Sequence, residues 1–359
     1  MSTQYFPIHW NKQKKYYDLI ALAFIVIYLA SYSIFSAITF PEDQQFSSIV
    51  ILIRAFGSCS LILLHIILLI GPLARLNSIF AVLLYNRRHL GVMTAIISLF
   101  HGALVTFFYH SFGSINPFLS LLTSSSEYTS FTSFPFEVFG LLALLILFVL
   151  ASISHDFWQK NLGRDIWKSI HMAIYFVYAL VIFHVALGVM QSEQDFIYVW
   201  IIGAGITLVT SAHIFTFFKE RAKDKKIFDQ KENWLQVANV NDFIINKAKM
   251  IKAANKERIA VFKHEKGFSA VTDLCAHQGG PLSEGKVVDG CITCPWHGWQ
   301  YRPEDGQSPP PFKEKVATYK TKIENNIVYV FYKPEGEGVY INPASFDKEN
   351  LTSNCSKNK

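Results

Sequence analysis

The chain has 359 residues, of which 51% are hydrophobic, and a positive mean hydropathy of +0.25. That composition is too apolar for an ordinary soluble protein, and the length leaves room for two or three domains. The formal net charge of +6 comes from short segments between and beside apolar runs, so it does not require a nucleic-acid partner.

Six apolar runs occupy most of the first 218 residues, at positions 18–40, 49–70, 90–109, 136–154, 167–189 and 196–218. Each is close to the ~20 residues that a helix needs to cross a bilayer. The first run is too long for a cleavable signal peptide, and no small-residue cleavage site follows it. The sequence therefore predicts an N-terminal tail, 1–17, and a transmembrane domain of six helices, 18–218.

The basic residues mark alternate ends of these runs. Lys and Arg precede the first run, lie between the second and third and between the fourth and fifth, and follow the sixth. The other three loops, 41–48, 110–135 and 190–195, contain neither. Because positively charged loops stay inside, we expect a multi-pass protein of the cell (inner) membrane with both termini in the cytoplasm.

The last third of the chain changes character. Residues 219–232, "KERAKDKKIFDQKE", predict a charged linker. Beyond it, stretches such as "RIAVFKH" and "IVYVFYK" alternate or form brief apolar runs between Gly, Asp, Asn and Pro residues, which is typical of strands. We expect a small all-β domain over 233–333 and a loosely ordered tail over 334–359.

Two Cys–His pairs in this β domain have the spacing of metal ligands. Cys275 and His277 form one pair, and Cys294 and His297 form the other. Each pair fits on one tight loop, so two loops that face each other would make a four-ligand site. In a reducing compartment, such clusters indicate metal or redox chemistry rather than disulfides. Zinc uses this donor set, and so does a Rieske [2Fe–2S] cluster.

The surrounding residues resemble the Rieske family. "CAHQGGPL" and "CPWHGWQY" match its two cluster-binding loops, and "SPPPF" matches its proline loop. The resemblance implies that Cys275 and Cys294 bind one iron and that His277 and His297 bind the other. Gly280 and Trp296 stand where respiratory members have a disulfide, so the resemblance is to the ferredoxin and oxygenase branch, with a potential near the ~−150 mV lower limit for Rieske centres. We interpret Cys291 as a strand residue.

Five histidines lie within the apolar runs: His65, His101, His171, His184 and His213. Ionisable groups in a membrane are costly, so each suggests a functional site. Depths estimated at ~1.5 Å per residue place His65 level with His171, and His101 level with His184. On one continuous helix, the thirteen residues between His171 and His184 correspond to ~20 Å and a turn of ~220°. The two would then face different helices and support two haems, since facing imidazoles can hold a haem iron axially.

The segment "YNRRHLG", with His101 after it, and "IWKSIHMAIYFVYALVIFH" are similar to the ferric-reductase-like transmembrane family. Within it the likeness is greatest to the membrane subunit of a periplasmic methionine-sulfoxide reductase system. This resemblance implies b-type haem on His101, His184 and His171. The second histidine that ferric reductases have in the third span is missing, so we expect His65, or alternatively His213, to complete the inner haem; otherwise the chain holds one haem.

Arg54 lies eleven residues before His65, which places both on the same face of a helix. It is a candidate partner for a haem propionate. The alternative is an arginine whose side chain extends to the lipid headgroups.

No flavin or nicotinamide domain is recognisable, so a cytosolic reductase would have to supply electrons. We expect an oxidoreductase that moves electrons from such a donor through a [2Fe–2S] cluster to one or two b haems. The outer acceptor would be a periplasmic reductase, quinone, ferric iron or oxygen. A membrane-tethered Rieske oxygenase is disfavoured, since the β domain leaves no room for a mononuclear iron domain. A membrane-anchored Rieske ferredoxin, acting as a redox sensor or as the donor to a partner oxygenase, is the alternative.

Overall fold

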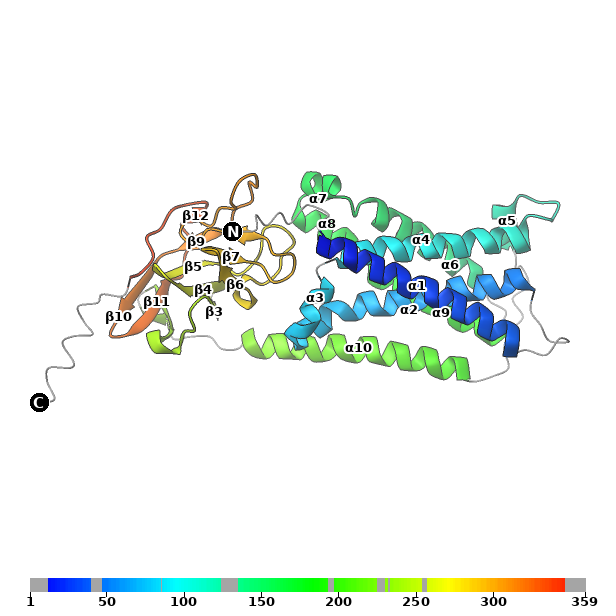
Figure 1. Ribbon diagram of the computed structural model, residues 1–359, viewed down its shortest axis with the longest axis horizontal. Coiled ribbons are helices and arrows are strands. Elements are labelled where there is room, and N and C mark those ends of the chain that lie inside the picture. Colours follow the sequence, from blue (N-terminus) through cyan, green and yellow to red (C-terminus); the bar gives the residue numbers. More distant parts are fainter. Residues whose placement is uncertain are drawn as a thin grey trace, which may run out of the picture. The chain divides into compact units, whose positions relative to one another are not determined.

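The computed structural model describes residues 12–39, 47–84, 86–123, 135–192, 197–224, 230–231, 233–253 and 257–345. The chain divides into two compact units, with the boundary between Thr216 and Phe217. The unit before this boundary is helical, and the unit after it is built mainly from strands (Figure 1).

Long helices that run side by side make up the first unit (Figure 1). They are α1 (Lys12–Thr39), α2 (Ser48–Leu76), α4 (Arg87–Val105), α6 (Phe136–Ser152), α9 (Ile174–Ser192) and α10 (Ile197–Asp224). The shorter segments are η2 (Ser78–Phe80), α3 (Ala81–Leu84), η3 (Thr106–His110), α5 (Pro117–Thr123), α7 (Asp156–Leu162) and α8 (Arg164–His171).

Five stretches of the described residues are helical, long and apolar enough to cross a membrane. They are Lys14–Thr39, Ser48–Leu76, Arg87–His110, Ile166–Gly188 and Val199–Ala222. The fourth expected run forms α6, an apolar helix of 17 residues that is shorter than these. The chain is therefore a multi-pass membrane protein, and five of its six expected spans have full length.

The fifth expected span is not one continuous helix. α8 ends at His171, and α9 begins at Ile174 after a turn at Met172 and Ala173. The assumption of an unbroken helix was wrong, because the helix is interrupted directly after His171. The estimated ~20 Å and ~220° between His171 and His184 therefore do not apply.

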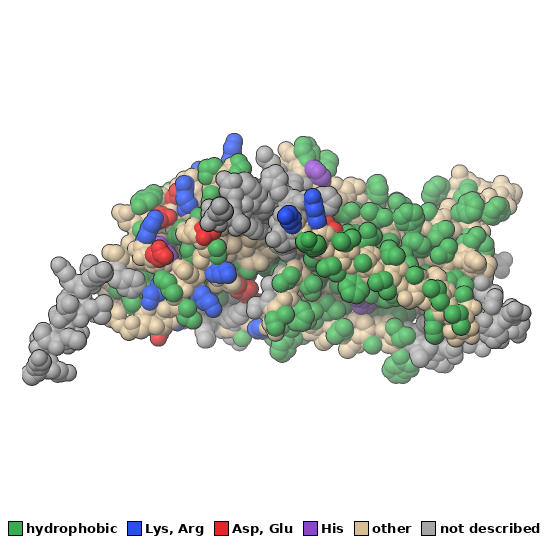
Figure 2. Space-filling model, viewed as in Figure 1, with side chains coloured by type: hydrophobic (Ala, Val, Ile, Leu, Met, Phe, Trp, Pro, Cys, Tyr) green, Lys and Arg blue, Asp and Glu red, His purple; other side chains and the backbone are tan. Residues whose placement is uncertain are grey.

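The helical unit is apolar outside as well as inside. Large side chains such as Phe24, Ile38 and Trp200 are 69–78% exposed, and Figure 2 shows hydrophobic side chains spread over the helices. Inside the unit, α2 packs on α4 and α6 packs on α9. Val177, which is fully buried, lies in the core between α6 and α9. An apolar surface of this kind is what a lipid environment requires.

Three antiparallel sheets make up the second unit, with strand orders β1-β2-β11-β10, β12-β9-β5-β4-β3 and β6-β7-β8. The strands of the first sheet are β1 (Gln230–Lys231), β2 (Trp234–Asn239), β10 (Thr321–Glu324) and β11 (Ile327–Phe331). Those of the second are β3 (Ala248–Lys252), β4 (Arg258–His264), β5 (Gly267–Thr272), β9 (Ala317–Tyr319) and β12 (Gly336–Glu337). The smallest sheet contains β6 (Lys286–Val288), β7 (Cys291–Thr293) and β8 (Gln300–Tyr301).

Among the described residues of this unit, two hydrophobic cores stabilise the fold. One contains Phe268 and Val328 and lies between the two larger sheets. The other contains Trp299 and Tyr301 and joins the small sheet to β4 and β5. Because Cys275 and Cys294 belong to the second core, with 1% exposure each, the metal-ligand loops are built on a packed foundation.

The ordered elements extend beyond two expected boundaries. α10 continues through the first part of the segment expected as a linker and ends at Asp224. Beyond Lys333, β12 pairs with β9, and Ala344 exchanges two backbone hydrogen bonds with Phe268. Residues 334–345 of the expected tail are thus attached to the domain, and residues 346–359 lie outside the described part of the chain.

Candidate metal and haem sites

The two Cys–His pairs lie on two loops of the same backbone geometry. In the first loop, the amide of Gly279 donates to the carbonyl of Cys275 at 2.8 Å, and the amide of Cys275 donates to the carbonyl of Gly280 at 2.9 Å. The second loop repeats both bonds with Cys294, Gly298 and Trp299. Gly279 and Gly298 have φ values of 75° and 69°, a conformation that favours glycine.

Each loop turns backbone amides towards its own sulfur. The Cys275 sulfur accepts hydrogen bonds from the amides of His277 and Gln278, and the Cys294 sulfur accepts them from Trp296 and His297. The hydroxyl of Tyr301 lies 3.2 Å from the Cys275 sulfur and accepts the amide of Ala276 at 3.0 Å. Such donors stabilise negative charge on sulfur.

The two thiols respond to this environment in opposite directions. Burial raises the pKa of Cys275, but hydrogen bonds from Cys294, Tyr301 and two backbone amides outweigh burial and lower it. The pKa of Cys294 is raised, first by its hydrogen bond with Cys275 and then by burial. Cys275 is therefore the sulfur on which this environment favours negative charge.

The two imidazoles face each other beside this pair. The rings of His277 and His297 lie 5.1 Å apart and are inclined by 85°. His277 stacks on Trp299 at 4.3 Å. The Trp299 indole donates to Ser308 at 2.8 Å and packs on Phe312. Ser308 and Phe312 delimit the proline segment, which thus holds the tryptophan beneath His277.

The donor set fits a two-iron cluster better than a single ion. Within the described residues, no group of three or more His, Cys, Asp and Glu side chains converges on one metal position. Zinc requires such convergence, because one ion takes all four ligands. A [2Fe–2S] cluster takes two sulfur ligands on one iron and two nitrogen ligands on the other. The two sulfurs and the two rings form separate pairs here, as that cluster requires.

Gly280 and Trp296 meet between the two loops. A Cβ placed on Gly280 would lie 2.8 Å from the Cys294 sulfur and 3.0 Å from the Trp296 ring. The indole therefore packs against the glycine backbone, at the place where the sequence resemblance locates a disulfide in respiratory members. This packing closes the loops without a covalent bond.

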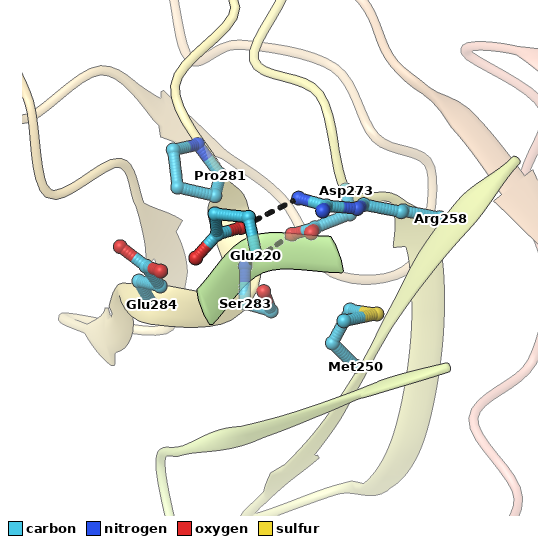
Figure 3. Close-up of a pocket in the computed structure, with 7 residues that line it drawn as sticks. All are labelled: Glu220, Met250, Arg258, Asp273, Pro281, Ser283 and Glu284. Atoms are coloured by element: carbon cyan, nitrogen blue, oxygen red, sulfur yellow. Dashed lines mark hydrogen bonds and ion pairs between the residues drawn. The ribbon is translucent and has the colours of Figure 1, made fainter. Parts of the chain in front are cut away.

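A pocket of about 210 Å³ lies beside the first loop, as Figure 3 shows. Arg258 forms an ion pair with Glu220 at 3.2 Å across it. Asp273 accepts the amide of Ser283 at 2.6 Å, and burial raises the pKa of Asp273 to about 6. Glu284 also lines the pocket. This mixture of charges selects no class of ligand.

In the helical unit, His101 of α4 and His184 of α9 come together. Their ring centres lie 6.2 Å apart and their planes are inclined by 76°. Two metal–nitrogen bonds of ~2 Å and a ring radius of ~1.1 Å on each side predict ~6.3 Å for two axial imidazoles on one metal. At 6.2 Å, the separation in the protein would allow both imidazoles to hold one metal.

The same helix motif holds both rings. His101 Nδ1 donates to the carbonyl of Ile53, and His184 Nδ1 donates to the carbonyl of Phe136, each at 2.9 Å. Four residues after each carbonyl stands a glycine, Gly57 or Gly140, where a Cβ would approach the ring to 2.9 or 2.7 Å. Backbone acceptors of this kind fix the tautomer and leave Nε2 as the nitrogen for a metal.

The other three membrane histidines have different surroundings. Each donates Nδ1 to the carbonyl four residues earlier in the chain: His65 to Leu61, His171 to Trp167 and His213 to Val209. The Nε2 atoms of His65 and His213 accept hydrogen bonds from Tyr178 and Tyr175, both at 3.1 Å.

His171 differs from these two. It stacks on Trp167 at 3.7 Å, and its Nε2 lies 3.3 Å from the Ser154 hydroxyl. That hydroxyl already donates to the carbonyl of Leu150 at 2.7 Å, so it has no proton to give to the imidazole. Within the described residues, His65 and His171 make no ring contact or hydrogen bond with each other.

Arg54 follows Ile53, whose carbonyl holds His101. Three sets of contacts were not predicted from the sequence. They are the glycines that contact the His101 and His184 rings, the tyrosines that donate to His65 and His213, and the Tyr301 hydroxyl beside the Cys275 sulfur. The glycines carry a detectable signal, because small residues in membrane helices often mark close approaches.

Two protein families match this chain. The Rieske [2Fe-2S] domain matches residues 233–320, and the ferric reductase like transmembrane component matches residues 56–182. The finer likeness to the membrane subunit of a methionine-sulfoxide reductase system stays a prediction.

Individual relatives match the β domain. Cholesterol 7-desaturase of Xenopus laevis is 43% identical over 89 residues, which are 22% of this chain and 20% of that protein. The ferredoxin component of the alkene monooxygenase system of Xanthobacter autotrophicus is 33% identical over 86 residues, which are 23% of this chain and 70% of the ferredoxin. The chain spans only 20–27% of the length of the cholesterol 7-desaturases that it matches.

One solved structure also aligns with part of this chain. A chain from the complex of reduced oxygenase and oxidized ferredoxin in carbazole 1,9a-dioxygenase aligns with 24% identity and a TM-score of 0.28. The alignment covers 30% of this chain and 100% of the other.

Proposed function

The chain belongs to the Rieske [2Fe–2S] family and joins its Rieske domain to a ferric-reductase-like transmembrane component, and we propose that it transfers electrons between the two. A donor at the Rieske domain supplies them, and an acceptor reached through the membrane domain receives them. The observation that carries this proposal is the His101–His184 pair. It brings two imidazoles together in the same chain as the Rieske loops.

In the proposed cluster site, Cys275 and Cys294 bind one iron, and His277 and His297 bind the other. The cluster supplies one-electron chemistry when bound. The chain's own residues set its properties: four backbone amides and the Tyr301 hydroxyl surround the sulfurs. Hydrogen bonds to sulfur favour the reduced, more negative state, whereas burial of the cysteines disfavours it.

In the proposed outer haem site, His101 and His184 would hold the haem iron. The haem supplies one-electron chemistry when bound. Ile53 and Phe136 orient the two imidazoles through their carbonyls. Arg54 is the proposed partner of a propionate, because it follows the carbonyl that holds His101.

A second, inner haem between His171 and His65 is a separate part of the proposal. His171 is suited to it, since its Nε2 receives no proton from Ser154. His65 becomes a ligand only if its Nε2 leaves the Tyr178 hydroxyl. Likewise, His213 becomes a ligand only if its Nε2 leaves the Tyr175 hydroxyl. A chain in which both bonds persist holds one haem.

The loop charges support an orientation with both termini and the Rieske domain in the cytoplasm of a cell whose inner membrane holds the protein. A cytosolic reductase is then the donor. A periplasmic reductase, quinone, ferric iron or oxygen is the acceptor on the other side.

A second candidate function is that of a membrane-anchored Rieske ferredoxin, a redox sensor or the donor to a partner oxygenase. The similarity to the ferredoxin component of an alkene monooxygenase system favours the donor role. In that case the membrane helices anchor the domain and carry no haem.

The test is the reduced-minus-oxidised spectrum of the purified full-length protein, with iron and sulfide analysis. We expect bis-imidazole b-type bands together with two irons and labile sulfide per Rieske domain. A cluster without haem would support the ferredoxin role and reject transmembrane transfer.

A further inference from the structure

We propose that His110 and Glu137 form a proton-uptake site coupled to reduction of the haem held by His101 and His184. The inference rests on the proposed function and extends it. It makes the transfer of an electron to this haem dependent on a proton, and it assigns that proton to two side chains outside the ligand sets.

The first observation is the state of His110. Its side chain is only 5% exposed. Nδ1 lies 3.0 Å from the Ser120 hydroxyl. Nε2 is buried without a hydrogen bond, although Oε1 of Glu137 lies 3.5 Å away. A buried nitrogen that makes no hydrogen bond destabilises the folded protein. A proton bound to Nε2 would allow it to donate a charge-assisted hydrogen bond to the Glu137 carboxylate.

The second observation is the backbone that carries His110. Residues Thr106–His110 form a π-helix at the end of α4. Such segments are rare and occur frequently at functional sites. The wider turn changes the direction of the side chains that follow, and His110 ends the segment beside α5, with Ser120 as its partner.

The third observation is the location of Glu137. It is 18% exposed in the first turn of α6, where the helix dipole stabilises a carboxylate. It directly follows Phe136, whose carbonyl holds His184 at 2.9 Å. The Cα atoms of consecutive residues are ~3.8 Å apart. The backbone of Glu137 therefore lies next to that of Phe136, the residue that orients the proposed ligand His184.

Among the residues that the structure describes, few other groups compete for this proton; Tyr109, which precedes His110, is 56% exposed. The elements that pack on this pair are α4, α5 and α9. α5 contains no titratable residue. In this half of the bundle, the titratable residues of α4 and α9 are the two proposed ligands, His101 and His184. Arg87, Arg88 and His89 lie at the other end of α4, and Tyr175 and Tyr178 lie near the other end of α9.

The coupling follows from electrostatics. One electron from the donor adds one negative charge in a low-dielectric interior, and a nearby negative charge favours protonation of its neighbours. One proton from solvent then binds Nε2 of His110, and the new N–H donates to Glu137. The balance would be one electron taken up at the haem site from the donor and one proton taken up from solvent by the His110–Glu137 pair.

The test is a redox titration of the full-length protein in nanodiscs, followed by haem absorbance at several pH values. We expect the midpoint potential of the haem that is lost in His101→Ala to fall as pH rises. The slope should approach the ~59 mV per pH unit of one proton per electron. Glu137→Gln and His110→Gln should flatten it while keeping the haem content.

His89→Gln is the matched control. His89 pairs with Asp18 at 2.8 Å at the opposite end of α4, so its variant should keep the slope. A wild-type slope that persists in both Glu137→Gln and His110→Gln, or a wild-type midpoint independent of pH, overturns this inference but leaves the proposed function intact. A chain that binds no haem contradicts both.

Discussion

His101 and His184 are each held by the same arrangement of neighbouring residues. Each Nδ1 donates at 2.9 Å to a carbonyl on the neighbouring helix, Ile53 or Phe136, and each ring rests on a glycine four residues further on. The two ring centres are 6.2 Å apart. Two unrelated helix pairs thus present their histidines in the same tautomer towards one position, which is what a bis-imidazole site requires.

The first prediction concerns these two ligands. His101→Ala and His184→Ala should each remove one haem from the purified protein. The iron–sulfur signal should stay unchanged, because the proposed cluster ligands belong to the other unit of the chain. The pyridine haemochrome assay measures the haem content. His155→Ala is the control, since His155 is exposed and caps α7. Equal haem content in all three variants would show that these rings are packing residues.

The second prediction uses the glycines. Gly57→Ala and Gly140→Ala place a methyl group within 3 Å of the His101 and His184 rings, so we expect lower haem occupancy. Gly91→Ala lies on α4 with nothing within 4 Å of its new Cβ. It should keep full occupancy and gain up to ~1 kcal/mol of helix stability. Unchanged occupancy in Gly140→Ala would contradict the packing argument.

The third prediction separates one haem from two. Gly205→Ala brings a Cβ to 2.5 Å from Nε2 of His65, whereas Gly203→Ala meets nothing within 4 Å. If His65 is a ligand, Gly205→Ala and His65→Ala should lower the haem content by one, and Gly203→Ala should not. Haem content that stays constant in all three variants assigns His65 to its hydrogen bond with Tyr178.

The fourth prediction concerns the cluster potential. Tyr301→Phe removes the hydroxyl that lies 3.2 Å from the Cys275 sulfur. A hydrogen bond of ~1 kcal/mol corresponds to ~40 mV for one electron, so the midpoint should fall by roughly that amount while the cluster remains bound. Tyr319→Phe, in the other core of the same domain, is the control. A midpoint that does not change would mean that Tyr301 does not act on the cluster.

The fifth prediction concerns pH and stability. His264 is 5% exposed and hydrogen-bonds to Ser269 at 2.8 Å. Burial lowers the pKa of His264 below its ordinary 6.5. The unfolded chain therefore binds more protons below pH 6.5, so this residue's contribution is complete above 6.5 and is lost as pH falls through the folded value.

Thermal unfolding at pH 7.5 and 5.5 measures this effect. The midpoint should fall more between these pH values in the wild type than in His264→Gln, which cannot titrate. A larger fall of the unfolding midpoint in His264→Gln than in the wild type would mean that folding raises the pKa of His264 instead of lowering it.

The sequence predicted the β domain, and the placement of the two Cys–His pairs on two loops, because those features are local. Cys–x–His and Cys–x–x–His lie on single loops, and the foundation residue Trp299 stands directly beside the second loop. The membrane site was harder. The pairing of His101 with His184 was predicted from their estimated depths and from a family resemblance. Neither argument predicts that the Phe136 carbonyl and Gly140, on a different helix, position His184.

The interruption after His171 was missed for a physical reason. "SIHMAIYF" carries no proline or glycine that would announce a break. Helix propensity is a weak guide to a local interruption of this kind. Likewise, nothing near Tyr178 identifies it as the partner of His65, because that contact joins residues 113 positions apart.

The most direct test of electron transfer follows haem absorbance after a membrane-impermeant reductant is added on the Rieske side of reconstituted protein. We expect rapid haem reduction in the wild type and in Cys291→Ser, since Cys291 is outside the ligand set. His277→Ala and His297→Ala should slow reduction at least ~10-fold, a barrier increase of ~1.4 kcal/mol, while keeping their haem content. Haem reduction at the wild-type rate in both variants would contradict the account, because electrons would then reach the membrane domain without the Rieske cluster.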